Sequence, residues 1–131
     1  MPDTSTGTLI NQISTVIVPV SDQDAAVAFY TEKLGFEKRA DVPMGEQMRW
    51  IEVAPPGASS TVAIVPPREG EPVGVQTRIA FSTHDIESAH AELTAAGVDC
   101  DEVERMGGPV PPMLFFRDQD ANKLLIVELS E

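Results

Sequence analysis

Two charged side chains, Glu52 and Arg78, lie on predicted strands whose other side chains on the same face are mostly apolar. A guanidinium in such a place binds a carboxylate or a phosphate through paired hydrogen bonds, and a carboxylate attracts an amine or moves a proton. Two opposite charges also satisfy each other, because an unpaired buried charge is costly. Glu52 and Arg78 are therefore candidates for ligand binding and for catalysis, and the alternative is that they only pair with each other.

The same faces carry side chains that suit a small organic molecule. Small-molecule sites combine a mostly apolar wall with a few polar groups that orient the ligand. Trp50 offers an aromatic face for stacking or for a cation, unless it only fills the core, and methionines adapt to irregular shapes. The predicted ligand-binding residues are Thr15, Met48, Trp50, Glu52, Ala63, Arg78, Met113, Phe115 and Leu125.

The histidines and the single cysteine are poorly placed for chemistry. His84 and His90 lie six residues apart around the start of a predicted helix, so one helical face does not present both to a metal ion. Cys100 follows the acidic Asp99 and has no histidine near it in sequence, which disfavours a reactive thiolate. We expect the histidines to serve the surface or packing.

The elements that must position these residues follow the pattern of one strand, one helix and three strands. Alternating apolar residues predict the strands. Ser21, whose hydroxyl can cap a helix, and Gly35, a natural stop, delimit the helix between the first two strands. The strands expected in this first half cover residues 13–20, 36–41, 47–54 and 60–65.

The second half of the chain repeats this pattern. Asp85 stands 63 residues after Asp22, and Gly97 takes the place of Gly35 if the first helix has one extra residue. A repeat of this length is too long for a solenoid unit and too short for an independent domain, so two half-sheets must close over one another. The second half predicts a helix over 86–96 and strands over 77–82, 98–105, 113–117 and 123–129.

We therefore expect one α+β domain over residues 1–131 that consists of two βαβββ modules. Module 1 covers about 9–66, the connection about 67–76 and module 2 about 77–129, while the small polar residues 1–8 predict a disordered tail. One face of each sheet should pack on its helix and the other should face a cleft. The helix-facing residues are Val16, Val18, Val20, Ile51, Val53, Val62, Ile64, Ile79, Phe81, Leu114, Phe116, Leu124 and Ile126.

The chain is strongly acidic, with 21 Asp and Glu against 9 Lys and Arg and a net charge of −12. A field of this sign repels phosphate backbones and anionic lipids, so we expect neither nucleic acid nor a membrane as a partner. The apolar runs are too short to cross a bilayer, and residues 1–3 lack the basic start of a signal peptide. The sequence indicates a cytoplasmic protein whose partners are neutral, cationic or apolar small molecules.

Two segments, residues 18–36 (VPVSDQDAAVAFYTEKLGF) and 116–128 (FRDQDANKLLIVE), resemble the vicinal oxygen chelate superfamily, which includes glyoxalase I, extradiol dioxygenases and bleomycin resistance proteins. The resemblance covers residues 13–128. It implies the glyoxalase/bleomycin resistance/dioxygenase fold, in which two βαβββ modules form a curved mixed sheet around a cleft. Members similar to this chain often form a homodimer with exchanged modules, and we expect a homodimer here.

The resemblance also gives the positions at which the metalloenzymes of the superfamily bind their metal through His, Gln or Glu. These ligands lie on the first and fourth strands of the two modules. The corresponding residues here are Thr15, Ala63, Arg78 and Leu125, with the position of Ala63 uncertain by two residues. A metal site needs about three protein donors, so we expect no metal at this site and no cofactor.

Several functions are compatible with this sequence. The first hypothesis is a metal-free protein that sequesters a small apolar or cationic molecule, such as an antibiotic. The second is a glyoxalase- or dioxygenase-type enzyme, a lyase or an oxidoreductase, whose metal is held outside the usual positions. The third is metal-free catalysis, in which Arg78 stabilises an enolate and Glu52 moves a proton. A module with a filled cleft and no ligand is the last, and the sequence leaves open whether the protein is an enzyme.

Overall fold

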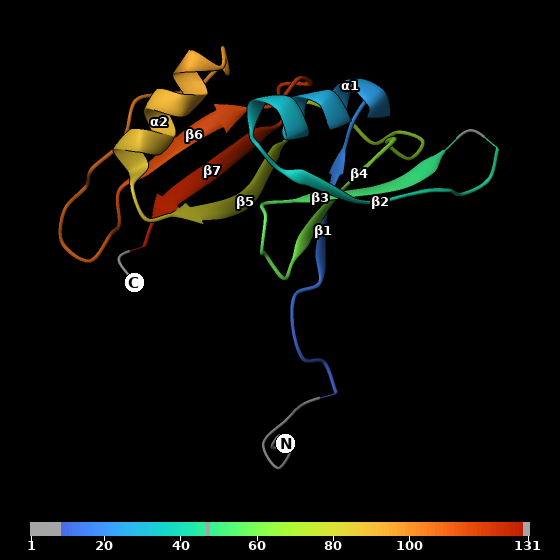
Figure 1. Cartoon of the computed structure of the whole chain (residues 1–131), viewed down its shortest axis with the longest axis horizontal. Helices are drawn as coiled ribbons and strands as arrows, with labels where there is room; N and C mark the ends of the chain where they lie inside the picture. Colours follow the sequence, from blue (N-terminus) through green and yellow to red (C-terminus); the bar gives the residue numbers. More distant parts are fainter. Residues whose placement is uncertain (1–8, 47, 130–131) are drawn as a thin grey trace.

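The computed structural model describes residues 9–46 and 48–129. The expected tail over residues 1–8 and the first residue of the strand expected over 47–54 lie outside this part. The first module contains β1 (Thr15–Pro19), α1 (Gln23–Ala28), the π-helical turn η2 (Phe29–Lys33), β2 (Glu37–Pro43), β3 (Arg49–Ala54) and β4 (Thr61–Val65); the second contains β5 (Gln76–Thr83), α2 (Ile86–Ala95), β6 (Met113–Arg117) and β7 (Lys123–Glu128) (Figure 1).

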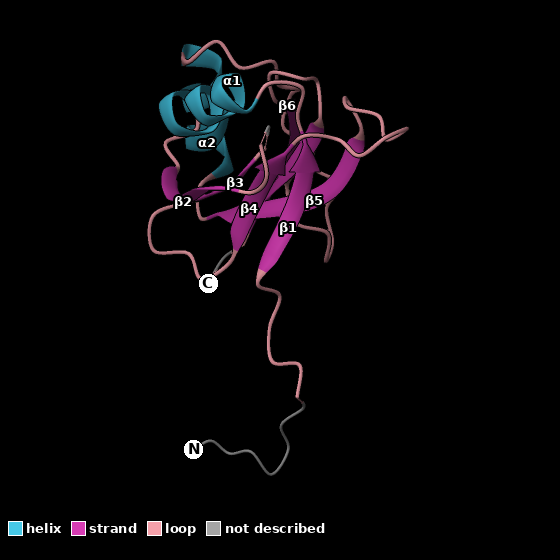
Figure 2. Cartoon of the chain, turned by 90° about the vertical axis from the view of Figure 1, so that its right-hand side faces the viewer, coloured by secondary structure: helices cyan, strands magenta, loops and turns pink. Residues whose placement is uncertain are grey.

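Each module forms its own sheet, with four strands in the first and three in the second, and the first three positions of the two sheets follow the same order. The strand order is β1-β4-β3-β2 in the first and β5-β7-β6 in the second. In both sheets the first strand is parallel to the last strand of its module, and the other neighbours are antiparallel. The helices form a layer on one side of the strands (Figure 2). The opposite faces of the sheets, called the open faces below, carry no helix. None of the helices in the described part is long and apolar enough to cross a membrane.

Both helices begin at an aspartate. The Asp22 carboxylate accepts a hydrogen bond from the Ala25 amide at 3.1 Å, and the Asp85 carboxylate accepts one from the Ser88 amide at 3.1 Å. This backbone hydrogen bond and one from the Ser88 hydroxyl hold the pKa of Asp85 below its ordinary value. The expectation that Ser21 caps the first helix is wrong. Its amide and hydroxyl donate to the carboxylate of Asp120 in the other module, at 2.8 and 2.6 Å.

The strand expected over residues 98–105 does not form as a continuous strand. This segment makes only isolated bridges to β6, from Cys100 to Phe116 and from Glu104 to Met113. Four acidic residues lie in the segment, and aspartate and glutamate pack poorly in a pleated sheet. Asp101 instead binds the guanidinium of Arg117 through two hydrogen bonds of 3.0 and 3.2 Å.

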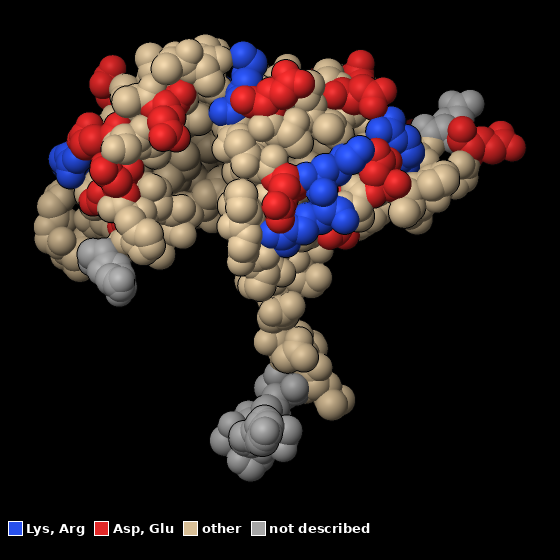
Figure 3. Space-filling model, viewed as in Figure 1, with Lys and Arg blue, Asp and Glu red and all other residues tan. Residues whose placement is uncertain are grey.

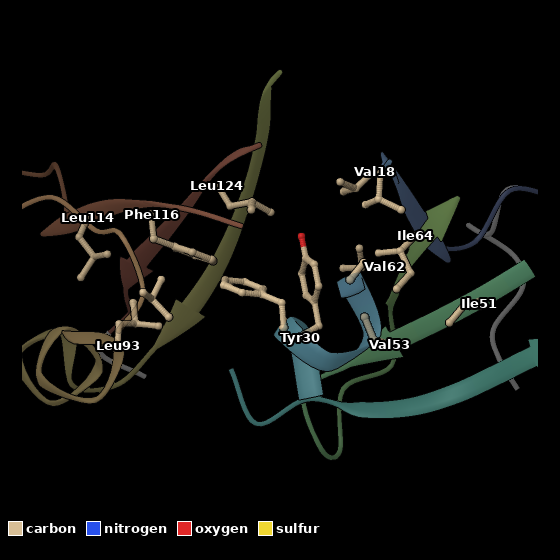
Figure 4. Close-up of a cluster of buried hydrophobic side chains, with 14 of the residues drawn as sticks. Val18, Tyr30, Ile51, Val53, Val62, Ile64, Leu93, Leu114, Phe116 and Leu124 are labelled. Carbon is tan, nitrogen blue, oxygen red and sulfur yellow. The ribbon is translucent and has the colours of Figure 1, made fainter. Parts of the chain in front are cut away.

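A single hydrophobic core joins the two modules under the helices. Tyr30 of η2 is fully buried and lies between the aliphatic side chains of the first module and those of the second (Figure 4). The alternation of apolar residues predicted this packing correctly. Of the expected helix-facing residues, Val18, Val20, Ile51, Val53, Val62, Ile64, Leu114, Phe116 and Leu124 are buried in the core, and Val16, Ile79, Phe81 and Ile126 are packed against it.

A buried polar network holds the modules together at the turn between β6 and β7. The Asn122 side-chain amide donates to the Pro19 carbonyl and to Asp118, both at 3.0 Å. Its oxygen accepts from the amides of Gly74 and Val75 in the connection, both at 2.9 Å. Because these are four hydrogen bonds, the hydrogen-bonding capacity of the Asn122 amide is filled. One side chain thus joins β1, the connection and the β6–β7 turn.

Tyr30 completes this network from the first module. Its hydroxyl donates to the buried Asp118 carboxylate at 2.8 Å. Burial, and then the nearby charge of Asp118, raise the pKa of Tyr30 far above its ordinary value, so the hydroxyl keeps its proton. The other oxygen of Asp118 accepts from the amides of Asp120 and Asn122, at 2.9 and 3.0 Å.

The network predicts the effect of substituting Asn122. Asn122→Ala should lower the free energy of unfolding by about 3 kcal/mol, because it removes the side-chain partner of the Pro19 carbonyl and of the Gly74 and Val75 amides, and one of the hydrogen bonds to Asp118. Urea unfolding followed by circular dichroism measures this loss. Asn11→Ala makes the same change at an exposed residue and should stay within about 0.5 kcal/mol of the wild type. Equal stabilities of the two variants would contradict the role of the network.

Candidate functional site

Arg78 lies where strand β5 departs from regular pairing. The register between β5 and β7 shifts around this residue, and Arg78 has a φ of 63°, in the left-handed region. Thr77 holds the irregularity, because its hydroxyl donates to the Lys123 carbonyl at 2.8 Å and accepts from the Ile79 amide at 3.1 Å. Bulges redirect a side chain, and a positive φ is costly for any residue except glycine. The fold therefore keeps an arginine in a strained position.

Arg78 lines two cavities that meet at its position. The larger has a volume of about 890 Å³ and lies between the edge strands β1 and β5, next to the loop 55–60. Its wall is largely apolar and includes Val16, Ala80 and Phe81. The smaller, about 280 Å³, is lined by Gln76, Arg78, Ile79, Phe115, Lys123, Leu124 and Leu125.

A third cavity, of about 200 Å³, lies between the end of η2 and α2. The space-filling view shows the surface hollowed between the two modules (Figure 3). Leu34 contributes to the wall of this cavity from the first module, and Phe81 and Leu93 contribute from the second. Phe81 also lines the larger cavity, so these two cavities both lie at the junction of the modules.

Glu52 lies on the open face of the first sheet, and both oxygens of its carboxylate accept hydrogen bonds from neighbouring side chains. Its two carboxylate oxygens accept hydrogen bonds from the indole of Trp50 at 2.7 Å and from the hydroxyl of Thr61 at 2.8 Å. The Thr61 hydroxyl lies 2.9 Å from that of Thr15. Because the only hydroxyl hydrogen of Thr61 goes to Glu52, Thr15 is the donor in this second bond. The polar groups of this face thus satisfy one another.

The structure does not pair Glu52 with Arg78. Glu52 is bound within the first sheet, whereas Arg78 is exposed on the second and forms no ion pair or hydrogen bond with another described side chain. The interpretation that the two charges neutralise each other is therefore wrong for the single chain. Metal-free catalysis by the two residues also finds no support, because Glu52 lines none of the three cavities.

The predicted ligand-binding residues fall into two groups, one on each sheet. Glu52, Trp50 and Thr15 lie on the first sheet, and Ala63 is buried opposite Glu52 in the β3–β4 register. Arg78, Phe115 and Leu125 lie together around the smaller cavity of the second sheet. Met48 and Met113 are half-buried and line none of the three cavities.

Lys123 is a residue of this site that the sequence interpretation missed. Its ammonium lies 4.5 Å from the ring centroid of Phe115, and it lines the smaller cavity. The period of two that places Leu125 on the open face also places Lys123 there, so the signal was present. The bulge at Arg78 had no such signal, because it depends on the side chain of Thr77.

Most other basic groups of the chain are paired with acids. Lys38 and Arg49 bind the carboxylate of Asp41, where basic and acidic side chains gather over β2 (Figure 3). Hydrogen bonds from Arg49, and then from Lys38, hold the pKa of Asp41 well below its ordinary value. The hydrogen bond from Arg117 likewise lowers the pKa of Asp101. Among the described residues, four basic side chains, Lys33, Arg68, Arg78 and Lys123, form no such pair.

Comparisons with known proteins agree with this architecture. Residues 10–126 match the family described as the Glyoxalase/Bleomycin resistance protein/Dioxygenase superfamily. The Bacillus subtilis (strain 168) protein YetH, described as uncharacterized, is 36% identical over 126 residues, which cover 92% of this chain and 100% of YetH.

Two solved structures are similar over nearly the whole chain. A member of the glyoxalase/bleomycin resistance protein/dioxygenase superfamily from Sphaerobacter thermophilus DSM 20745 has a TM-score of 0.86 and 35% identity, covering 93% of this chain and all of that one. TnmS3, an antibiotic binding protein from Streptomyces sp. CB03234, has a TM-score of 0.82 and 31% identity, covering 92% of this chain and 98% of its own.

The four positions that correspond to metal ligands do not fit a divalent metal ion. Ala63 and Leu125 have no donor atom, Arg78 is a cation, and the Thr15 hydroxyl is bound to Thr61. Metal sites of this kind use imidazole, thiolate or carboxylate donors. Within residues 9–46 and 48–129, no group of three or more His, Cys, Asp or Glu side chains could hold a metal elsewhere.

The strain at Arg78 gives a prediction for stability. Arg78→Gly should raise the free energy of unfolding by about 1 kcal/mol, because glycine adopts a positive φ without a steric cost. Urea unfolding measures the change. Ala121→Gly, at a φ of 64° in the β6–β7 turn, is the matched variant and should also be stabilising. If only Ala121→Gly were stabilising, Arg78 would not be strained.

Proposed function

We propose that this chain, which belongs to the Glyoxalase/Bleomycin resistance protein/Dioxygenase superfamily, binds a small and largely apolar organic molecule reversibly, with no metal ion and no chemical change to the ligand. The observation that carries this proposal is the chemistry of the site. A largely apolar cavity of about 890 Å³ lies where the modules meet, and the positions of the metal ligands hold non-ligating side chains. A cavity of this size and polarity suits a small molecule.

The likeness to TnmS3 supports the same class of function. TnmS3 is described as an antibiotic binding protein, and it is similar to this chain over 92% of its length. Binding without catalysis needs only shape and a few orienting polar groups, whereas superfamily chemistry on a metal needs donors that this site lacks. Sequestration therefore fits the residues present better than lyase or oxidoreductase activity does.

We further propose that two copies of the chain complete the binding site. The two groups of predicted ligand-binding residues lie on separate sheets, and the open faces of these sheets leave apolar side chains in solvent. Ile17 on β1 is 57% exposed, and Ile13 just before it is 72% exposed. A symmetric homodimer would cover such residues on both chains at once, and the acidic surface disfavours nucleic acid as the partner.

A neutral fluorescent probe tests the binding proposal. N-phenyl-1-naphthylamine should bind saturably with a rise in fluorescence, and treatment with EDTA should not change its affinity. Ala80→Trp should weaken binding at least tenfold, about 1.4 kcal/mol, because Ala80 lines the larger cavity and the indole would occupy the part of it next to Phe81. Ala91→Trp on the exposed side of α2 is the matched control and should bind like the wild type.

Two results of this titration would overturn the proposal. One is the absence of saturable binding by the wild-type chain. The other is binding that EDTA abolishes and that zinc, nickel, manganese or iron restores, which would assign a metal-dependent site and revive the metalloenzyme hypothesis.

Light scattering after size exclusion tests the dimer. The expected mass is twice the chain mass of 14.1 kDa. Ile17→Glu should shift the mass toward the monomer, because it places a charge in the buried face of the proposed interface. Ala91→Glu adds the same charge to an exposed position of α2 and should remain dimeric. A wild-type chain that is monomeric at all concentrations would rule out the interface.

A further inference from the structure

We propose that the smaller cavity binds the carboxylate of an apolar ligand through Arg78 and Lys123, so that the site selects anionic over neutral molecules of the same shape. This inference rests on the proposed function, since it assigns the polar end of a ligand whose apolar body occupies the larger cavity. It departs from the expectation of a cationic ligand that the acidic composition suggested.

The pairing of charges on the rest of the chain supports this assignment. The chain has 21 acidic and 9 basic residues, so carboxylates outnumber the cations by more than two to one. Five of the nine, Lys38, Arg39, Arg49, Arg105 and Arg117, form ion pairs. The other four form none within the described ranges, and of these Arg78 and Lys123 line the same cavity, whereas Lys33 lines another and Arg68 lines none of the three. Two unpaired cations on the wall of one cavity make a local site for an anion.

The surroundings of Lys123 keep its ammonium available. It lies over the ring of Phe115, a contact that holds a cation without neutralising it. Asp101 attracts Lys123, but both oxygens of this carboxylate bind the guanidinium of Arg117. The ring of Phe115 therefore positions the ammonium of Lys123, and no carboxylate neutralises its charge.

The bulge gives Arg78 a defined direction toward the same space. Thr77 fixes the backbone on both sides of Arg78 through its hydroxyl, so the guanidinium starts from a rigid strand. A guanidinium binds a carboxylate through two parallel hydrogen bonds, and the side-chain amide of Gln76, which also lines the cavity, can donate a third. Retaining arginine at a positive φ is costly, which fits a side chain selected for binding.

The two cavities define how a ligand would lie. Arg78 and Ile79 line both cavities, so they form the boundary between them. A ligand with its carboxylate at Arg78 and Lys123 would place its apolar body against Ala80 and Phe81 in the larger cavity. The apolar wall supplies affinity by burial, and the cationic pair supplies the choice between charged and neutral ligands.

Calorimetric titration with 2-naphthoate and 2-naphthamide tests the inference on the full chain. The two probes share one ring system and differ in charge. The wild-type chain should bind naphthoate at least tenfold more tightly than naphthamide, about 1.4 kcal/mol, and this preference should shrink as salt screens the charges. Arg78→Gln and Lys123→Gln should each reduce the preference to about threefold or less, with the affinity for naphthamide changed by no more than about twofold.

Arg68→Gln is the matched control. Arg68 is exposed, forms no ion pair among the described residues and lines none of the three cavities, so its removal changes the net charge equally and should leave the preference intact. A loss of preference in Arg68→Gln, or a preference retained in Arg78→Gln, would overturn the inference.

The two levels of the proposal fail in different ways. If the wild-type chain binds N-phenyl-1-naphthylamine but binds naphthoate and naphthamide equally, the anion site is wrong and the apolar binding function stands. If none of the three probes binds, the proposed function fails and the anion site fails with it.

Discussion

The buried polar network around Asn122 is the constraint on which the arrangement of the two modules depends. It joins β1, the connection and the β6–β7 turn through one side chain, and Tyr30 adds the first helix. The core packs residues from both modules around Tyr30, but apolar contacts alone do not fix an orientation, because they are not directional. Hydrogen bonds with filled capacity are directional. The edge strands β1 and β5, and the cavity between them, are therefore set by a network outside the cavity.

The sequence predicts the fold well because its signal is local. Alternation of apolar residues identifies which face of each strand packs on a helix, and every residue predicted to face the helices lies in the core or against it. The prediction from sequence fails where a residue distant in the chain determines the local structure. Ser21 is a good capping residue, yet its hydroxyl binds Asp120, and Asp22 caps the helix. The segment 98–105 also shows alternation of apolar residues. In the structure, however, Asp101 binds Arg117, and the segment pairs with β6 only at isolated bridges.

The site is harder to predict than the fold for the same reason. Alternation predicted Arg78, Phe115 and Leu125 as ligand-binding residues, and in the structure these three side chains line one cavity. It could not show that Glu52 is bound by Trp50 and Thr61, because those bonds depend on side-chain geometry across three strands. Composition does not resolve the charge inside the site. An excess of twelve negative charges describes the distant field, whereas the charge that a ligand meets is that of the few groups lining its cavity.

Among the described residues, two that are not glycine have a positive φ, Arg78 and Ala121. The surroundings of these two strained residues differ. Ala121 lies in the turn that carries Asp118 and Asn122, so its conformation serves the polar network that holds the modules. Arg78 has a comparable φ, but its guanidinium forms no hydrogen bond or ion pair within the described chain, and Thr77 makes the hydrogen bonds that hold the bulge. A structural role would be served as well by glycine. Arginine adds at that position a positive charge at the boundary of two cavities, and the proposed anion site gives this charge a function.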